Sequence, residues 1–87
     1  VTEHGLGSAD DAQRVAFIPP ALAGLKAVID AGIPVRGYIH WSLLDNFEWI
    51  FGYGPKYGLY AVDRQSFRRT AKPSAAVYAA IARRNAL

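Results

Sequence analysis

The sequence predicts an α/β chain that forms part of a larger sheet rather than a complete small domain. Its hydrophobic periodicity indicates the order strand, helix, strand, long loop and helix within 87 residues. Because 52% of the residues are hydrophobic, the chain is too apolar for a disordered segment. Two parallel strands with two helices leave sheet edges unpaired, and a two-stranded sheet is only marginally stable. The pattern therefore indicates a slice of a larger α/β fold.

The first expected strand is short and is followed by a loop. Only two residues precede the polar pair Glu3-His4, whereas a strand usually has about five residues. Gly5 and Gly7 then permit a sharp turn. Residues 1–9 are therefore expected to form the stub of a strand and the loop that leaves it.

A helical segment is expected to open at Asp10-Asp11, since carboxylates at a helix start cap free N–H groups and suit the helix dipole. Apolar residues then recur at helical spacing as far as residue 29. Prolines cannot sit deep inside a straight helix. At Pro19-Pro20 we therefore expect a short first helix to end in a bend, and a longer helix to start near Pro19. Gly32 marks the end of this longer helix.

Residues 35–42 (VRGYIHWS) are expected to form the second strand. Large side chains occupy both of its faces, with Ile39 and Trp41 on one and Tyr38 and His40 on the other. This pattern favours a parallel strand that is covered on both faces. A helix between two parallel strands connects them as a right-handed βαβ unit.

The stretch 43–72 is long and irregular, with a weak strand expected at residues 59–62. A loop of this length inside a folded domain is usually functional. Pro73 is expected to start the last helix, because proline is favoured at the first helical position. One face of that helix carries Val77, Tyr78 and Ile81.

Composition excludes several classes of function. The absence of Cys excludes a disulfide framework, a thiolate metal site and a Cys nucleophile. No run of about 18 apolar residues is present, so no membrane partner is expected. No signal peptide is visible, and a cytoplasmic location is expected. His4 and His40 lack the His-x-x-x-His spacing of many metal sites, and neither a metal nor another cofactor is expected.

Charge is distributed unevenly along the chain. Residues 1–48 hold three basic and six acidic residues, and residues 49–87 hold seven basic residues and one acidic residue. A basic half of this kind suits either a nucleic-acid partner or a solvated outer face. Because the cations are not interleaved with aromatic residues, the solvated face is favoured and no nucleic-acid partner is expected.

Two groups of residues lie at the C-terminal ends of the expected strands, where α/β folds build their sites. Glu3 suits a general base, a nucleophile or a surface cap, and with Glu48 it forms a candidate carboxylate pair for acid/base chemistry on a polar substrate. Asp45 lies in the same aromatic run as Glu48, where partial burial would perturb its pKa. Trp41 and Trp49 either fill a core or stack on a sugar ring. Aromatic faces beside carboxylates favour a sugar pocket.

The same motifs resemble one enzyme family over the whole chain. Residues 1–5 (VTEHG) resemble the TENG nucleophile motif of glycoside hydrolase family 1, the β-glucosidases and related β-glycosidases. Residues 35–49 (VRGYIHWSLLDNFEW) are similar to the eighth-strand signature of that family. Residues 52–63 (GYGPKYGLYAVD) are similar to the loop that follows it, and residues 72–78 (KPSAAVY) to the start of the last helix.

The resemblance implies a role for each matching residue. Glu3 would be the catalytic nucleophile that forms a covalent glycosyl-enzyme intermediate. Trp41 would form the floor of the glycone site, and Glu48 would accept hydrogen bonds from the 4- and 6-hydroxyls of the sugar. Trp49 would contact the 3-hydroxyl region, and Tyr57 would line the glycone pocket. Without the resemblance, Glu48 is a candidate acid/base partner of Glu3. The resemblance implies instead that Glu48 binds the sugar.

The resemblance also implies a fold and a partner. The family fold is a (β/α)8 barrel, in which residues 1–87 would be strands seven and eight with helices seven and eight, a C-terminal quarter and not an independent domain. The acid/base Glu lies in an Asn-Glu-Pro motif that this chain lacks. A retaining mechanism needs two carboxylates about 5–5.5 Å apart. The expected partners are therefore a separate N-terminal segment of the same barrel and a small β-glycoside substrate.

Two details of the resemblance concern local structure. The Trp41–Ser42 peptide is expected to be cis. His4 stands where the family usually has Asn. An imidazole in that place either raises the acid limb of the activity or points away from the site, and the second interpretation is favoured.

The predicted function is hydrolysis of β-glycosidic bonds, β-glucosides above all, with retention of configuration. The alternative is a non-catalytic sugar-binding or interaction fragment derived from such a barrel. That alternative keeps Trp41, Glu48 and Trp49 but never meets an acid/base residue, so it predicts binding of glucose without turnover.

Overall fold

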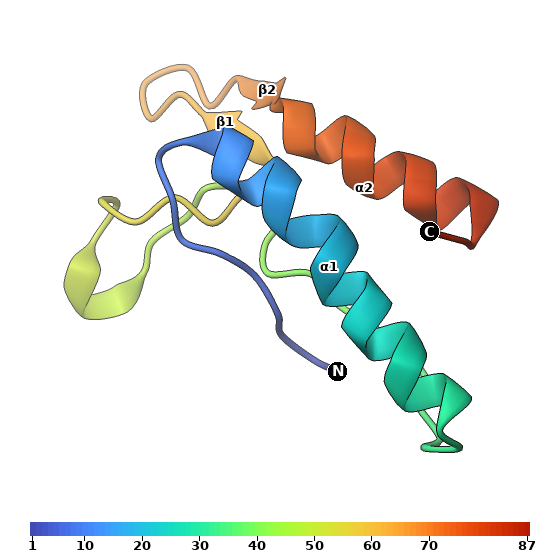
Figure 1. Cartoon of the computed structure of the whole chain (residues 1–87). Coiled ribbons are helices and arrows are strands. Elements are labelled where there is room, and N and C mark those ends of the chain that lie inside the picture. The colour runs from blue at the N-terminus through green and yellow to red at the C-terminus, as the bar shows by residue number, and fades with distance from the viewer.

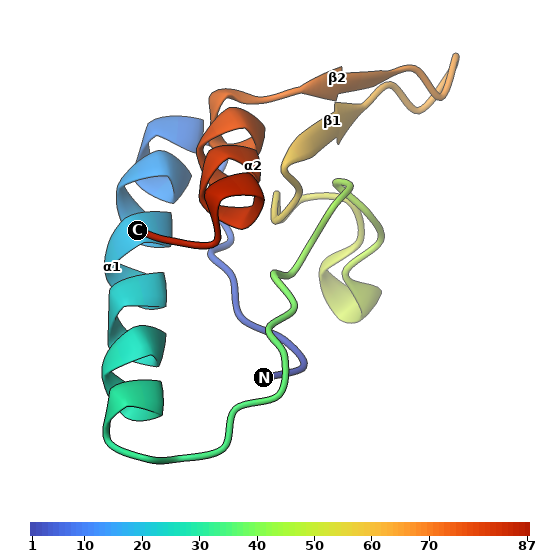
Figure 2. The ribbon, with the colours of Figure 1, turned by 90° about the vertical axis from the view of Figure 1, so that its right-hand side faces the viewer.

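A computed structural model describes all residues from 1 to 87. The elements follow in the order α1 (Asp11–Asp30), a 3-10 turn η1 (Trp49–Phe51), β1 (Tyr60–Val62), β2 (Arg69–Ala71) and α2 (Pro73–Arg84). Figure 1 shows the two helices side by side, with the β1–β2 hairpin at one end of α2. In Figure 2 the two extended segments, 1–9 in blue and 33–48 in green, lie beside each other on one side of α1.

Helix α1 begins where the sequence predicts and continues without a break through its two prolines. The Asp10 side chain caps the helix by accepting a hydrogen bond from the backbone N–H of Ala12 at 3.0 Å. The expectation that a first helix ends and a second helix starts at Pro19 is wrong, because one continuous helix includes Pro19 and Pro20. The φ angle that proline imposes is itself helical. The turn before the prolines is held by tertiary packing, since Arg14 and Ile18 are both buried.

The two extended segments pair in parallel, but they do not form regular strands. A single parallel bridge joins His4 to His40, and the N–H of Trp41 donates to the carbonyl of His4 at 2.9 Å. The next bond runs from Ile39 N–H to the carbonyl of Val1 at 3.0 Å. Between these two bonds the chain advances three residues from Val1 to His4 but only two from Ile39 to Trp41. This mismatch interrupts the ladder. The parallel pairing is confirmed, whereas the regular strand expected at 35–42 is wrong.

Only one face of segment 35–42 is covered within this chain. His40 packs against Tyr78 of α2, with 5.5 Å between ring centroids. On the opposite face Ile39 is 58% exposed. The expectation that both faces are covered is therefore wrong for the chain by itself, because both of its helices lie on the same side of the segment.

The long loop contains a hairpin that the sequence reveals only in part. The strand expected near residue 60 is confirmed as β1, and it pairs antiparallel with β2 from Tyr60↔Ala71 to Val62↔Arg69. Strand β2 was missed because it has three residues, of which only Thr70 favours a strand. The Asp63 carboxylate accepts from the N–H of Gln65 at 2.8 Å and shapes the turn between the strands.

Helix α2 begins at Pro73 as expected, and the residues of its predicted apolar face are half-buried. Asn85 ends the helix in a left-handed conformation. Ser74 is fully buried, and both its hydroxyl and its N–H donate to the Asp11 carboxylate, at 2.7 and 2.8 Å. These bonds attach the start of α2 to the start of α1.

The interior of the chain is more polar than apolar. The buried apolar residues are only Ile18 and Leu59, whereas five buried residues are polar or charged. Those five are Arg14, His40, Ser42, Asp45 and Ser74. The apolar core is therefore very small for a chain of this length, and a polar network determines how the pieces fit together. Neither helix is long and apolar enough to cross a membrane.

Candidate functional site

Four of the five residues predicted for the site line one cleft. A cavity of about 370 Å³ is lined by Glu3, Trp41, Glu48 and Tyr57, together with His4 and Gly5. The fifth predicted residue, Trp49, lies outside this cleft and is 79% exposed. It lines a second cavity of about 370 Å³ that adjoins the first, because Glu48 and Tyr57 contribute to both.

Glu3 reaches the cleft because the backbone after it passes directly over Trp41. Glu3 is exposed, and its carboxylate makes no hydrogen bond within the chain. Two residues later, a Cβ atom at Gly5 would lie 1.8 Å from the carbonyl oxygen of Trp41. Only glycine therefore allows the two segments to approach this closely. The carboxylate of Glu3 is held at the cleft with its oxygens free.

Trp41 orients Glu48 across the cleft. The indole N–H of Trp41 donates to Oε1 of Glu48 at 3.2 Å. The Trp41–Ser42 peptide is cis, as the family resemblance implies. The N–H of Ser42 donates to the carbonyl of Tyr57 at 3.1 Å, which attaches the backbone of Tyr57 to the residue after Trp41. One oxygen of Glu48 is thus occupied by the protein, and the other is available to a ligand.

Asp45 serves as an anchor and does not line the cleft. It is only 5% exposed, and its Oδ1 accepts from the N–H of Gly58 and from Nζ of Lys72, each at 2.8 Å. Lys72 also donates to the carbonyl of Gly58 at 2.8 Å. The aromatic run thus contains a buried ion pair that fixes the loop after residue 43 against the start of α2.

The His4 side chain packs toward α1. Its ring meets Phe17 of α1 edge-on, with 5.2 Å between centroids, and its Nδ1 lies 3.1 Å from the Tyr38 hydroxyl. Burial raises the pKa of Tyr38, so this hydroxyl stays protonated. His4 therefore joins the segment that carries Glu3 to the helix layer behind it.

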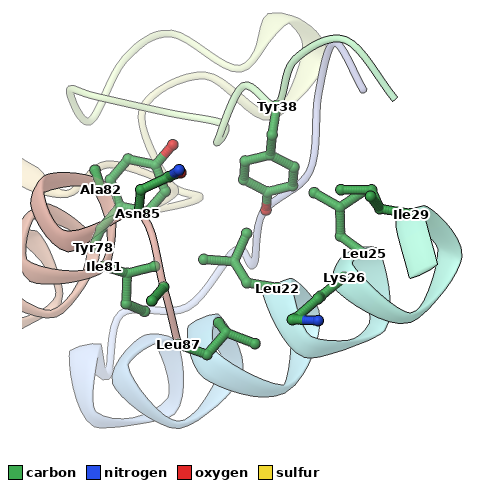
Figure 3. A pocket seen from close by; sticks show the side chains of 11 residues that line it. Leu22, Leu25, Lys26, Ile29, Tyr38, Tyr78, Ile81, Ala82, Asn85 and Leu87 are labelled. Carbon is green, nitrogen blue, oxygen red and sulfur yellow. The ribbon is translucent and has the colours of Figure 1, made fainter. Parts of the chain in front are cut away.

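A larger cavity than this cleft is remote from these residues. A groove of about 710 Å³ lies between the two helices, and Figure 3 shows Leu22 and Leu25 of α1 on one side of it with Tyr78 and Ile81 of α2 on the other. Its lining contains no Asp, Glu or His side chain. Size alone therefore does not identify the site, and the smaller cleft holds the groups that are able to act on a substrate.

Sequence reasoning missed Arg14, which is fully buried behind the cleft. Its Nη1 pairs with the Asp11 carboxylate at 2.7 Å. Burial raises the pKa of Asp11, but hydrogen bonds from Ser74 and Arg14 outweigh that effect, and the pKa lies below its usual value. The sequence feature that indicates a role for Arg14 is the Asp-x-x-Arg spacing of Asp11 and Arg14, because this spacing places acid and base on the same helix face.

Comparison with known proteins agrees with the motifs of the cleft. In α/β barrels the functional side chains lie at the carboxyl ends of the strands, and Glu3 and Trp41 lie at the carboxyl ends of two segments that pair in parallel. The chain matches the model of glycosyl hydrolase family 1 over residues 1–87, and it belongs to this family.

Individual relatives support the same assignment. Beta-glucosidase 47 of Arabidopsis thaliana is 46% identical over 84 residues, which cover 90% of this chain and 16% of the relative. A beta-galactosidase of Saccharolobus solfataricus is 40% identical over 87 residues, covering all of this chain and 18% of the relative. The apo structure of a beta-glucosidase (1317) superposes with a TM-score of 0.96 at 56% identity, covering all of this chain and 22% of that one. The chain thus spans about a fifth of the length of its relatives and corresponds to a segment of their barrel.

His40 is expected to make the stability of the fold sensitive to acid. Burial lowers the pKa of His40 below its usual 6.5, and the charge of Arg14 and the nearby His4 lower it further. Both ring nitrogens are buried without a hydrogen-bond partner. The unfolded state therefore takes up the proton first as the pH falls below about 6.5, and stability is lost down to the lowered pKa of the folded state.

The measurement is urea unfolding between pH 7.5 and 5 of the assembled barrel, meaning this segment together with the rest of the family fold. His40→Leu removes the titrating group, so the loss of stability over this range is expected to shrink. His4→Asn is the comparison variant and should keep most of the loss, because His4 is the smallest of the three causes that lower the pKa of His40. An unchanged pH dependence in His40→Leu would contradict the prediction.

Proposed function

We propose that the protein containing this segment hydrolyses β-glycosidic bonds with retention of configuration, with β-glucosides as preferred substrates. The observation that carries the proposal is the single cleft in which Glu3 lies with Trp41, Glu48 and Tyr57. Membership of glycosyl hydrolase family 1, and relatives named beta-glucosidase and beta-galactosidase, support it.

Glu3 is the proposed nucleophile. Its carboxylate attacks the anomeric carbon, a bond forms between that carbon and the carboxylate oxygen, and the bond to the aglycone oxygen breaks. An acid/base Glu on another segment gives its proton to the departing oxygen and then takes one from the water that releases the sugar. The free oxygens of Glu3 suit this role because no hydrogen bond within the chain competes for them.

The remaining residues are proposed to bind the sugar. The Trp41 indole forms the floor of the glycone site, and the Trp41 N–H holds Glu48 in place to accept hydrogen bonds from the sugar 4- and 6-hydroxyls. Tyr57 forms a side wall of the cleft. Trp49, in the adjoining cavity, contacts the 3-hydroxyl region. Because Glu48 suits glucosides and galactosides alike, the preference for glucose is the part of the proposal that a substrate panel must test.

The chain is proposed to act as strands seven and eight with helices seven and eight of the barrel, together with a partner segment that supplies the acid/base residue. Two features support this assembly. The chain buries only two apolar residues, and the outer face of segment 35–42 is uncovered. A barrel segment has such exposed surfaces because neighbouring strands and helices pack on them.

The test is hydrolysis of an aryl β-glucoside by the assembled barrel, followed by NMR of the first-formed sugar. Release of the β-anomer is expected, since two displacements at the anomeric carbon restore its configuration. Release of the α-anomer would overturn the retaining mechanism. Binding of glucose without hydrolysis would replace the proposal by the alternative of a sugar-binding fragment.

A further inference from the structure

Arg14 joins two backbone segments that flank the cleft. Its Nη2 lies within hydrogen-bond distance of three carbonyl oxygens, those of Leu6 at 3.0 Å, of Ser8 at 2.8 Å and of Lys56. Two protons are thus shared among three acceptors, in a side chain that has no exposed surface. The contacts lie wholly within this chain, and burial leaves no room for a group from elsewhere to replace them.

The two backbone segments that Arg14 joins are also the segments that position the Tyr57 ring. Leu6 and Ser8 lie on either side of Gly7, and a Cβ atom at Gly7 would lie 2.7 Å from Cζ of Tyr57. The ring therefore rests on bare backbone whose two flanking carbonyls are bound to Arg14. Lys56, whose carbonyl is the third acceptor of Arg14, directly precedes Tyr57. The same carbonyl also accepts from the N–H of Ser8 at 2.9 Å.

We propose that Arg14 is a positioning residue, which sets the Tyr57 side wall of the cleft relative to the loop that leaves Glu3. The guanidinium does not line the cleft. It acts by holding residues 6–8 against residues 56–57 at a fixed separation. A lysine keeps the positive charge, but its single nitrogen cannot hold Asp11 and three carbonyls at once. The inference rests on the proposed function, in which Tyr57 lines the glycone site.

The test is a double-mutant cycle in the assembled barrel with an aryl β-glucoside. Arg14→Lys is expected to lower kcat/KM by about 10- to 100-fold, mainly through KM, because a displaced wall weakens binding geometry. In a Tyr57→Leu background the same change should cost less than about 3-fold, since residues that act through one another are not additive. Arg83→Lys, at an exposed arginine of α2, is the matched control and should leave both constants unchanged.

A spectroscopic readout separates this proposal from the proposed function. With 3-fluorotyrosine at position 57, the 19F resonance is expected to shift or broaden in Arg14→Lys but not in Arg83→Lys. An unmoved resonance overturns the positioning role even if the barrel is active. Additive losses in the cycle overturn it as well. An inactive barrel whose resonance still moves contradicts the proposed function and leaves Arg14 as the residue that places Tyr57.

A second variant covers the case in which Arg14→Lys does not fold. Gly7→Ala keeps the guanidinium and displaces the same ring directly, because the new Cβ meets the end of the Tyr57 side chain. It is expected to raise KM about 10-fold or more and to move the same 19F resonance. An unchanged KM and resonance in Gly7→Ala would overturn the proposal.

Discussion

Glu3→Gly is expected to abolish hydrolysis of an aryl β-glucoside by the assembled barrel, with a loss in kcat of roughly 10⁴-fold or more. The carboxylate is the proposed nucleophile, and no other carboxylate of the chain except Glu48 lines the cleft. Glu48 is the proposed sugar-binding residue, and the Trp41 indole holds one of its oxygens. The measurement is the steady-state rate with an activated leaving group, for which departure of the aglycone needs little acid assistance.

Two controls distinguish loss of a nucleophile from loss of the fold. Asp30→Asn removes an exposed carboxylate that pairs only with Lys26, and its rate should match that of the unsubstituted barrel. Added azide should restore aglycone release in Glu3→Gly and form an α-glycosyl azide, because one displacement inverts the anomeric carbon. Undiminished hydrolysis in Glu3→Gly would rule out the nucleophile role.

Gly5→Ala is expected to be the most damaging single-methyl change in the site. The added Cβ would lie 1.8 Å from the Trp41 carbonyl oxygen and 2.9 Å from its carbonyl carbon, so one of the two backbones must move. Overpacking typically costs about 1–3 kcal/mol, and contact with backbone rather than a flexible side chain places this case at the upper end. The same shift separates Glu3 from Trp41, and activity should fall together with stability.

The matched control is Gly24→Ala in α1, where an added Cβ meets nothing within 4 Å. Alanine is favoured over glycine inside a helix, so this variant should be more stable by about 0.5–1 kcal/mol and equally active. Urea unfolding and kcat/KM check both variants. Gly5→Ala with ordinary stability and activity would show that the close approach of the two segments does not matter.

Much of the fold was predictable because its signals are local. The Asp10 cap, the glycine after α1 and Pro73 act within one helical turn, and α1 and α2 begin where these residues predict. The continuation of α1 through Pro19-Pro20 was not predicted, because the interactions that hold this part of the helix are not local. Proline weakens a helix by a known local amount, whereas the burial of Arg14 and Ile18 before it depends on parts of the chain that are distant in sequence.

The site was predictable to the extent that its residues end extended segments. Glu3 and Trp41 meet because parallel pairing brings His4 opposite His40, and that pairing follows from the βαβ order. Asp45 shows where the residues alone mislead. A carboxylate in an aromatic run suits chemistry as well as structure, and only the positions of Gly58 and Lys72 assign it to an ion pair.

The sequence alone thus determined where the helices begin, that two extended segments pair in parallel, and which side chains meet at their carboxyl edge. The helix starts depend on residues a few positions apart, and the parallel pairing follows from the order strand, helix, strand along the chain. The tertiary structure decided the roles of Arg14, His40 and Asp45. Each is buried against groups from distant parts of the chain, such as Lys56 for Arg14, and burial decides whether a polar side chain acts as an anchor, a proton-sensitive group or a reactive one.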